Sequence, residues 1–436
     1  MWTVLVLLLL GCAALIGFGS LVRTAATSGT AGTIALEIAT IPRTLKHVAR
    51  GDAFTPARPT YEGPDKRPDA GFRANLAQPF VDPGYALITA LDPASGRPII
   101  RLIRLRDGRT IHDYRPDIDA INARSTFKSA LVDLRRDSGV MQNWMMHPLL
   151  MPDGGIIIHD SSPLARIDAC GRTEWIVDGI FHHSVERGPD GSIWAAYRYP
   201  ISPIHDAGPL FGDDAVAELS PTGKPLRLIR IADILDRNGL SSLWRQRPYV
   251  DDPFHLNDVQ PVSTSGRFWQ AGDLFLSLRN MSLILLYRPS TGRVIWHRIG
   301  PWAMQHDVSV VDDHRIAMFD NHWRFAAPEG AIDGTNRIPF YDFATDAVSY
   351  PFARATQEQT LMTHAQGRAT PMANGDMFVE ETERGRLMRV APDGTVRWRY
   401  IAADAHGHGI ALRWSRYLDP LTDGPAIQAA VNARCS

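Results

Sequence analysis

Cysteine is rare in this chain of 436 residues, which has only three cysteines, and no two of them are spaced as C-x-x-C. A structural zinc site is therefore not indicated. An excess of charge of one sign is also missing, because the formal net charge is -1, which argues against a broad electrostatic surface for nucleic acid. Cys170 and Cys435 could form a disulfide that joins the first half of the fold to the C-terminus, or both could be free thiols.

Charged residues are absent from Trp2 to Val22, an apolar run of the length that spans a bilayer. No basic residue precedes it, which favours an uncleaved membrane anchor over residues 1–22. A cleaved signal peptide and a lipoprotein modified at Cys12 are the alternatives. Arg23 follows the run, and the positive-inside rule would place the body in the cytoplasm. The activity considered below instead favours a membrane-anchored body that faces the periplasm or the cell exterior.

Long helix-periodic segments are scarce, and the best local candidate is Asp233 to Arg247. A pattern of apolar strands repeats instead, with a period of roughly 40–50 residues that is typical of propellers. Asp-Gly, Asn-Gly and Thr-Gly turns separate the strands, because glycine readily supplies the positive φ of hairpin turns. The six copies cover residues 84–114, 149–177, 186–231, 272–299, 310–352 and 372–401. We therefore predict an all-β, six-bladed β-propeller over residues 80–436, preceded by a linker over residues 23–79 and the N-terminal transmembrane helix.

Histidines recur at a similar place in these repeats, shortly before an inner strand. In a propeller the innermost strand of each blade lines the central channel, so residues that precede it lie at one mouth of that channel. We expect the side chains in this register to converge. They are His147, His183, His255, His306 and His364, with Gln366 beside the last.

Clustered imidazoles can bind a metal, move protons or act as nucleophiles. Asp258 and Asp307 could add carboxylate ligands for a metal. Arg279 favours a different chemistry, because a guanidinium repels a metal and binds an oxyanion such as sulfate or phosphate. Such donors would stabilise charge on a transferring group, unless Arg279 only forms a surface ion pair.

Four segments together resemble the arylsulfotransferase family. They are DPFHLNDV, LFLSLRNMSLILLYRPSTGRVIWHRIG, QHDVSV and MFDNH, within residues 252–322, and the likeness extends over roughly residues 140–405. The family pattern reads His-x-Asn, Ser-x-Arg, Gly-x-x-x-Trp and Gln-His. The resemblance implies a propeller enzyme that moves a sulfuryl group from an aryl sulfate donor to a phenol acceptor without a nucleotide donor. No cofactor is then expected, and no phosphate-binding Gly-rich loop is found in the sequence.

The resemblance also implies residue roles. His306 would take the sulfuryl group and become a transient sulfohistidine. His255 and Asn257 would contact the sulfate and the leaving oxygen, and Arg279 would bind the sulfate. His183, rather than its neighbour His182, would supply the His-His motif of an earlier blade.

Further candidates for substrate contact are His182, Asp258, His364 and Trp302. Trp269, Trp302 and Trp323 could stack on an aromatic ring, or they could simply pack in the blades. Asp258 departs from the family pattern, which has a small hydroxyl residue there. A carboxylate is unfavourable beside an anionic substrate unless it points away or orients a histidine.

Two other functions remain open at this point. One is a metal-assisted hydrolase or lyase on the same propeller, using the histidines with Asp258 or Asp307. The other is a tethered, non-catalytic module that binds a ligand or a protein on its top face, since a fold does not determine a function. The sequence indicates no oligomeric state, and the expected membrane contact is through residues 2–22.

Overall fold

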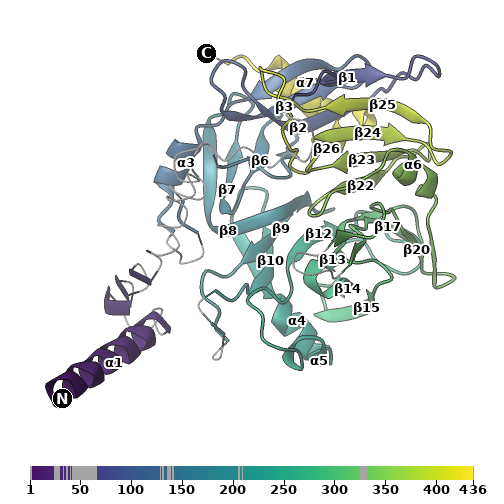
Figure 1. Ribbon diagram of the computed structural model, residues 1–436. Helices are drawn as coiled ribbons and strands as arrows, with labels where there is room; N and C mark the ends of the chain where they lie inside the picture. Colours follow the sequence, from purple (N-terminus) through teal and green to yellow (C-terminus); the bar gives the residue numbers. More distant parts are fainter. Residues whose placement is uncertain are drawn as a thin grey trace.

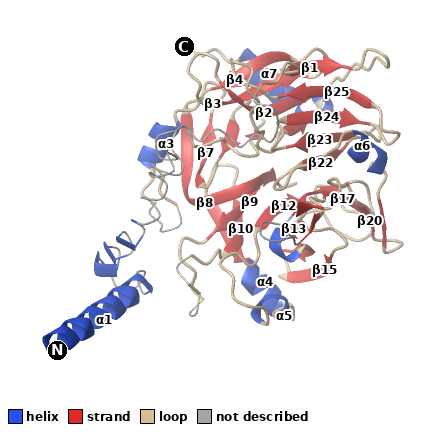
Figure 2. Ribbon diagram, viewed as in Figure 1, coloured by secondary structure: helices blue, strands red, loops and turns tan. Residues whose placement is uncertain are grey.

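Antiparallel strands form nearly all of the body of this protein (Figures 1 and 2). The computed structural model describes residues 2–23, parts of 30–41, and 66–435 apart from short gaps at 128, 130–131, 135–138, 140–141, 205–206, 209 and 325–330. Most of the predicted linker, including residues 42–65, lies outside the described residues. Helix α1 (Trp2–Arg23) is apolar, and none of Trp2–Val22 is buried against the body, so it could cross a membrane or serve as a signal sequence.

Three four-stranded sheets and one five-stranded sheet are arranged as separate blades. The first contains β26 (Arg416–Leu418), β2 (Tyr85–Leu91), β3 (Pro98–Arg104) and β4 (Arg109–Tyr114). The second contains β12 (Leu256–Pro261), β13 (Leu274–Leu278), β14 (Leu283–Arg288) and β15 (Arg293–Ile299). The third contains β16 (His306–Val310), β17 (Arg315–Phe319), β20 (Phe340–Asp342) and β21 (Ala347–Ser349). The fourth contains β22 (Arg368–Pro371), β23 (Met377–Glu381), β24 (Arg386–Val390), β25 (Val396–Ile401) and β1 (Gly71–Ala74).

The propeller-like, all-β architecture is confirmed, but the prediction of six separate blades is wrong. Instead of two further blades, one continuous seven-stranded sheet contains β5 (Leu149–Leu150), β6 (Ile156–Ile158), β7 (Ser162–Ile167), β8 (Thr173–Arg187), β9 (Ile193–Arg198), β10 (Asp214–Leu219) and β11 (Pro225–Arg230). The cause is β8, whose 15 residues pair with β7 over the first part and with β9 over the whole second part. A short hairpin, β18 (Trp323–Arg324) with β19 (Ala331–Ile332), forms an additional small sheet.

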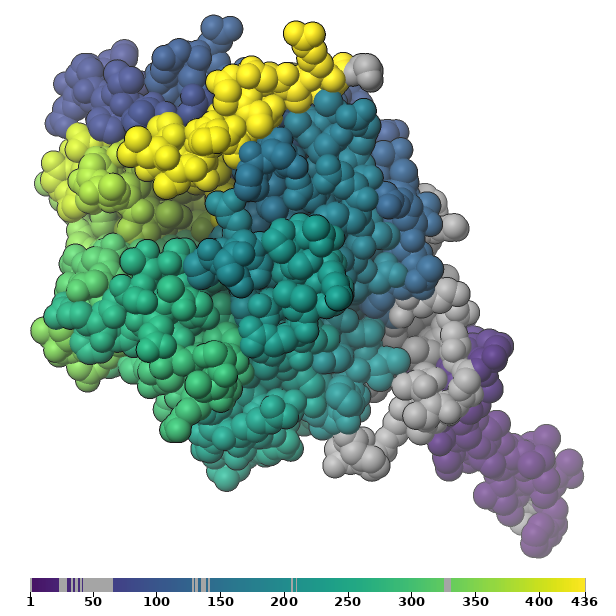
Figure 3. Space-filling model, turned by 180° about the vertical axis from the view of Figure 1, so that it is seen from behind, coloured from purple at the N-terminus to yellow at the C-terminus, as the bar shows by residue number. Residues whose placement is uncertain are grey.

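The two ends of the body close the ring together. Strand β26, near the C-terminus, pairs with β2, and β1 pairs with β25. Helix α7 (Pro420–Asn432) then packs across the early strands through Ala426, Ile427 and Ala430. It lies so close to the β5–β6 turn that a side chain at Gly154 would meet the backbone of Ala430. Figure 3 shows this C-terminal segment in yellow against the blue segments.

The remaining helices are short and lie at blade edges: α3 (Ile118–Arg124), α4 (Ile231–Arg237), α5 (Ser242–Arg245), α6 (Ala353–Glu358) and a 3₁₀ turn (Arg279–Met281). The predicted helix over Asp233 to Arg247 is thus present as two pieces, α4 and α5. Gly239, with φ at 72°, interrupts it in the left-handed region that glycine adopts most easily. The buried faces of α4 pack on the blade formed by β12–β15.

Side chains of one blade complete the backbone hydrogen bonds of the next around the axis. Among the described strands none pairs with the inner edge of these first strands, and buried N–H groups there need acceptors. Each acceptor is a side chain of the preceding inner strand or of the segment just before that strand. The four hydrogen bonds are Val185 N–H to His147 Nδ1 (3.3 Å), Val259 N–H to Ser184 Oγ (2.8 Å), Val308 N–H to Asp258 Oδ2 (2.7 Å) and Ala369 N–H to Asp307 Oδ2 (2.7 Å).

The structure joins Cys170 and Cys435 in a disulfide, 265 residues apart in sequence. The bond ties the end of the chain to the turn after β7, beside the packed helix α7. Cys12 is free and exposed.

We expect Cys435→Ser to lower the unfolding free energy of the full-length protein by about 2–4 kcal/mol, because a cross-link over a long loop restricts the unfolded chain. Urea unfolding without reductant measures the loss, and Cys12→Ser is the matched control. Equal stability of Cys435→Ser and wild type would contradict a structural role for the bond.

Candidate active site

Breaks in strand pairing aim the candidate residues toward the axis. The register shifts between His182 and Val185 in β8, between Leu256 and Asp258 in β12, and between His306 and Val308 in β16. Such bulges turn a side chain out of the normal alternation and are frequent beside active sites. The bulged positions include the predicted residues His183 and Asn257.

Strained backbone marks the same region. Several residues other than glycine have φ in the left-handed region, which costs energy and is found most often at functional sites. Around the axis they include His183 (57°), His255 (52°), Asp307 (50°), Gln366 (63°) and Trp414 (58°).

Three of the predicted histidines lie close together, and two of them, His183 and His306, contact one buried tryptophan. The His183 ring lies 5.0 Å from His255 and 6.2 Å from His306, measured between centroids. The Trp414 ring, which is fully buried, lies 6.0 Å from both His183 and His306. The indole thereby forms the floor between the two imidazoles and keeps water from below them.

The tautomer of His306 follows from its neighbours. Asn321 uses its Nδ2 to donate to the carbonyls of Thr363 (3.0 Å) and Gln366 (2.9 Å), so its amide oxygen faces the imidazole. His306 Nδ1 must then carry the proton in its 2.7 Å hydrogen bond to Asn321 Oδ1. The lone pair on Nε2 accepts a longer hydrogen bond, 3.2 Å, from the backbone N–H of Gln366. Burial, with the positive charge of Arg279, lowers the pKa of His306 well below its usual range.

A chain of polar contacts supports the other two imidazoles. His255 Nδ1 donates to Asp252 at 2.5 Å, and Arg198 joins Asp252 (2.9 Å) to Asp214 (2.7 Å). Burial works to raise the pKa of Asp252, but the hydrogen bond and charge of His255 outweigh it, so the pKa is lowered. At the other end, Nδ1 of His182 and Nδ1 of His183 are 2.9 Å apart. Burial, followed by the charges of neighbouring imidazoles, lowers the pKa of His183 well below normal.

Arg279 is a cation without a carboxylate partner among the described residues. It is half-buried, its Nη1 donates to Asn280 Oδ1 (2.8 Å), and its Nε has no hydrogen-bond partner. Burial lowers its pKa. Asn257 differs from Arg279, since its Nδ2 donates to the Gln305 carbonyl (2.8 Å) and its unpaired atom is the buried acceptor Oδ1. A guanidinium left unneutralised at a partly dry site favours an anionic ligand.

Asp258 accepts a hydrogen bond from a neighbouring strand and does not face the imidazole cluster through that oxygen. It is buried, and its Oδ2 accepts the Val308 N–H described above. Burial and the charge of Asp307 raise the pKa of Asp258 well above normal. The carboxylate that departs from the family pattern therefore does not have to oppose an anionic substrate with a full charge.

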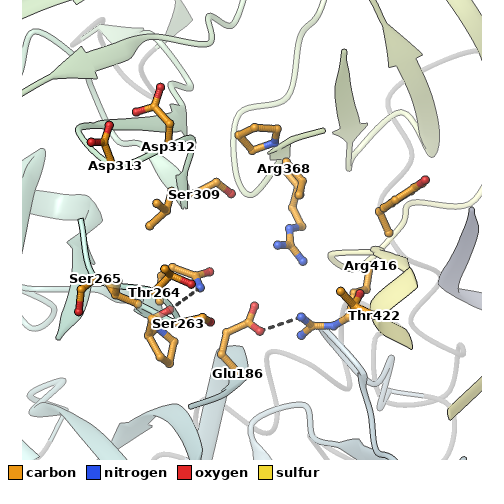
Figure 4. Close-up of a pocket in the computed structure, with 17 residues that line it drawn as sticks. Glu186, Ser263, Thr264, Ser265, Ser309, Asp312, Asp313, Arg368, Arg416 and Thr422 are labelled. Carbon is orange, nitrogen blue, oxygen red and sulfur yellow. Dashed lines mark hydrogen bonds and ion pairs between the residues drawn. The ribbon is translucent and has the colours of Figure 1, made fainter. Parts of the chain in front are cut away.

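A layer of paired charges lies beneath the imidazoles. Arg368 contacts both Asp307 (3.0 Å) and His147, and Arg416 pairs with Glu186 at 2.8 Å. Glu186, Arg368 and Arg416 line a cavity of about 680 Å³ at the opposite mouth of the channel. Figure 4 shows Arg368 reaching into it, with the Glu186–Arg416 pair across from it. Burial lowers the pKa of His147 strongly, so His147 is a neutral part of this layer and not a member of the upper site.

The remaining predicted residues lie at the edge or in the core. His364 is 44% exposed and approaches Glu383 at 3.5 Å. Trp302 is buried and donates to the Ser282 carbonyl (3.0 Å), and Trp269 packs in the same apolar cluster. Trp269 and Trp302 are therefore core residues that pack in the blades.

Three supporting residues had not been assigned a role from the sequence. Asp252 stands three residues before His255, and this spacing could have indicated its hydrogen bond. Asn321 lies in the MFDNH segment, but the sequence does not predict which way its amide group faces. Trp414 belongs to no motif, and nothing in the sequence marks it.

Taken together, this cluster offers a neutral imidazole with a free Nε2 lone pair in reach of a single N–H, a carboxylate-backed imidazole and a guanidinium without a carboxylate partner among the described residues. These are the parts required to move an oxyanion group between two oxygens. Among described residues, only Asp312, Asp313 and His314 bring three possible metal-ligand atoms within 4.8 Å of one another. They lie away from the three imidazoles, in the turn after β16, so the pocket's own side chains are not gathered as a ligand set.

Comparison with known proteins identifies one family model. Arylsulfotransferase (ASST) matches residues 147–403, more than half of the chain. No curated protein matches the sequence. Similar solved structures include a protein of unknown function from Bacteroides caccae (11% identity, 77% of this chain and 99% of that chain, TM-score 0.48). Others are virginiamycin B lyase from Staphylococcus aureus (13%, 80% and 98%, 0.41) and the Neurospora crassa Pan2 WD40 domain (12%, 83% and 97%, 0.40). At these identities and TM-scores, the structures do not bear on function.

The buried histidines predict how stability depends on pH. Burial lowers the pKa of His147, His183 and His306, and that of His159 to about 3. Below pH 6.5 the unfolded chain binds protons at these rings and the folded chain does not, so the unfolding free energy falls as pH falls. Each ring contributes up to about 1.4 kcal/mol per pH unit. Asp258 has a raised pKa and acts in the opposite sense at lower pH.

A single variant isolates one of these contributions. Between pH 6.5 and 5, His159→Leu should lose less stability than wild type, by about 1.4 kcal/mol per pH unit. Urea unfolding at several pH values measures the slope, and the same change at exposed His297 is the control. An identical slope in His159→Leu and wild type would show that His159 is protonated in the folded protein.

Proposed function

This chain belongs to the arylsulfotransferase family, and we propose that it transfers a sulfuryl group from an aryl sulfate to a phenol through His306. The observation that carries the proposal is Arg279, a half-buried guanidinium with no carboxylate partner among the described residues, beside a neutral His306. A sulfate ester is an anion that such a group binds well.

In the first step, His306 Nε2 attacks sulfur while the bond from sulfur to the aryl oxygen breaks. The Nδ1 proton remains on the ring, held by Asn321, so the sulfonated imidazole carries a positive charge next to the negative sulfuryl group. Arg279 is the group that we assign to hold the sulfuryl oxygens. Asn257 is not assigned this role, because its Nδ2 donates to the Gln305 carbonyl and its free Oδ1 can only accept a hydrogen bond. The Gln366 N–H, which now points at Nε2 from 3.2 Å, must release it and can then donate to a sulfuryl oxygen.

The departing phenoxide needs a proton, and His255 is the best-placed donor. Asp252 accepts the His255 Nδ1–H at 2.5 Å and orients the ring, and protonated His255 gives its Nε2 proton to the phenoxide. In the second step a phenol replaces the first product, His255 takes its proton, and the phenol oxygen attacks sulfur. The bond from sulfur to Nε2 breaks, and neutral His306 is restored. The His183 ring lies near both His255 and His306, and its Nδ1 can exchange a proton with Nδ1 of His182.

Two features of the chain support an oxidising compartment for the body. A disulfide forms and persists where the surroundings are oxidising. The Cys170–Cys435 bond and the apolar helix α1 therefore support a body on the outer side of a membrane, in the periplasm or outside the cell.

Removal of the unpaired guanidinium tests the proposal. With nitrophenyl sulfate and phenol as substrates, Arg279→Ala should lower kcat/KM by about 100- to 1000-fold, as expected for a donor to a charged transition state. Arg293→Ala, at an exposed arginine on β15, should have no effect. Wild type that turns over no aryl sulfate, or an Arg279→Ala variant as active as wild type, would overturn the proposed function.

The proposed acid role of His255 predicts a dependence on the leaving group. Asp252→Asn should reduce kcat by roughly 10- to 100-fold for phenyl sulfate, whose phenoxide needs protonation, and much less for nitrophenyl sulfate. Both rates are measured with the same acceptor. A uniform loss across donors would instead indicate that Asp252 only maintains the fold of the site.

A further inference from the structure

A second hollow adjoins the cluster of His255, Arg279 and His306, which we call the sulfuryl pocket, and shares Asp252 and Asn280 with its supports. Its volume is about 630 Å³. Its walls come from the segment before β10, from the end of α5 with the loop that follows, and from the 3₁₀ turn after β13. The lining is mainly apolar and aromatic, and includes Phe211, Leu243, Trp244, Tyr249, Val250 and Met281.

Two residues are shared between this hollow and the supports of the sulfuryl pocket. Asp252 and Asn280 line the hollow. The same two residues bind the catalytic groups, since Asp252 accepts from His255 and Asn280 accepts from Arg279. Asn280 also donates to the Asp252 carbonyl at 2.7 Å, so the two are held together. A molecule in the hollow thus lies next to the residues that orient His255 and Arg279.

We propose that this hollow, the aryl pocket, binds the apolar ring system of a phenolic substrate with two or more rings. The inference rests on the proposed function and specifies its substrate class. The hydroxyl or sulfate ester of such a substrate lies toward His255 and Arg279, and the rings lie against Phe211, Tyr249 and Met281.

The size of the aryl pocket favours more than one ring. A cavity of about 150 Å³ suffices for benzene, whereas pockets for larger organic ligands span about 300–1,000 Å³. At about 630 Å³, the aryl pocket falls in the second class. A single phenol would leave most of it filled with water against apolar walls, which gains little from the hydrophobic effect.

Several contacts hold the aromatic walls in place before any ligand arrives. Trp244 Nε1 donates to Asp236 (3.1 Å), and its ring packs edge-on against Phe254 at 5.4 Å. The Tyr249 hydroxyl accepts the Gly208 N–H at 3.0 Å, although 58% of the Tyr249 side chain is exposed. Rigid, exposed aromatic rings of this kind bind flat apolar ligands with little loss of entropy.

The rim adds a charge preference. Arg245 lies over the Trp244 ring at 4.2 Å, and Arg247 is exposed beside it. Their positive charges would attract an anionic sulfate ester more than a neutral phenol. Arg245 is partly neutralised by Asp236, and the Asp252 carboxylate in the lining is paired with Arg198 and His255, so Arg247 is the strongest contributor.

The test compares two acceptors of different size in variants that leave the sulfuryl pocket intact. The variants are Tyr249→Ala and Val250→Arg, and Val81→Arg on another exposed surface is the matched control. With nitrophenyl sulfate as donor, both variants should raise KM for naphthol by about tenfold and KM for phenol by less than about twofold. The initial burst of nitrophenol should stay unchanged, because it reports only transfer to His306. Calorimetric binding of naphthol to the full-length protein gives a second readout that needs no turnover.

The outcomes separate the aryl pocket from the proposed function. A normal burst with equal KM changes for both acceptors, or with none, overturns the aryl pocket and leaves the sulfotransferase in place. If no burst occurs with any aryl sulfate, but naphthol binds wild type and not Val250→Arg, the pocket stands and the proposed function fails. An absence of both burst and naphthol binding overturns both.

Discussion

The whole site depends on how the inner strands satisfy the N–H groups on their axial edge. In the part of the chain that the structure describes, no strand pairs with that edge, so buried side chains from the preceding blade accept these hydrogen bonds. Ser184, Asp258 and Asp307 do so at 2.7–2.8 Å, and each occupies or adjoins a bulge that redirects the neighbouring residue upward. The same local irregularity therefore ties the blades together and presents the imidazole and amide groups at the mouth. A polar layer that is fully hydrogen-bonded is rigid, which suits a site whose groups must be held in fixed positions.

Electrostatics then divide the channel into two levels. Below, Arg368 and Arg416 are each matched by a carboxylate, and His147 is neutral. Above, Arg279 has no such partner among the described residues, and burial keeps the His306 ring neutral, with a single proton on Nδ1. An anion entering from above meets an unneutralised cation and an uncharged nucleophile together. In water these effects would be weak, but the Trp414 floor and the surrounding blades lower the local dielectric and strengthen them.

Much of this could be predicted from the sequence, and the limits have physical causes. The repeats and Gly turns reveal blades because each blade buries both faces and needs tight hairpins. The blade count was wrong, since nothing in the sequence shows that β8 continues from one ladder into the next. His183, His255 and His306 share a register, so their convergence followed from the fold. Orientation did not follow: Asn321 fixes the His306 tautomer through contacts to residues about 40 positions away, and Trp414 arrives from the closing end of the chain.

The most direct test of the account is whether His306 becomes covalently sulfonated. The full-length protein would be exposed briefly to nitrophenyl sulfate without a phenol acceptor, and its intact mass recorded, followed by mapping of the modified peptide. The account predicts a gain of about 80 Da on wild type, located on His306 and absent in His306→Asn, as expected for nucleophilic catalysis. Release of nitrophenol without any adduct, or an adduct on another residue, would contradict the assignment of His306 as the sulfuryl acceptor.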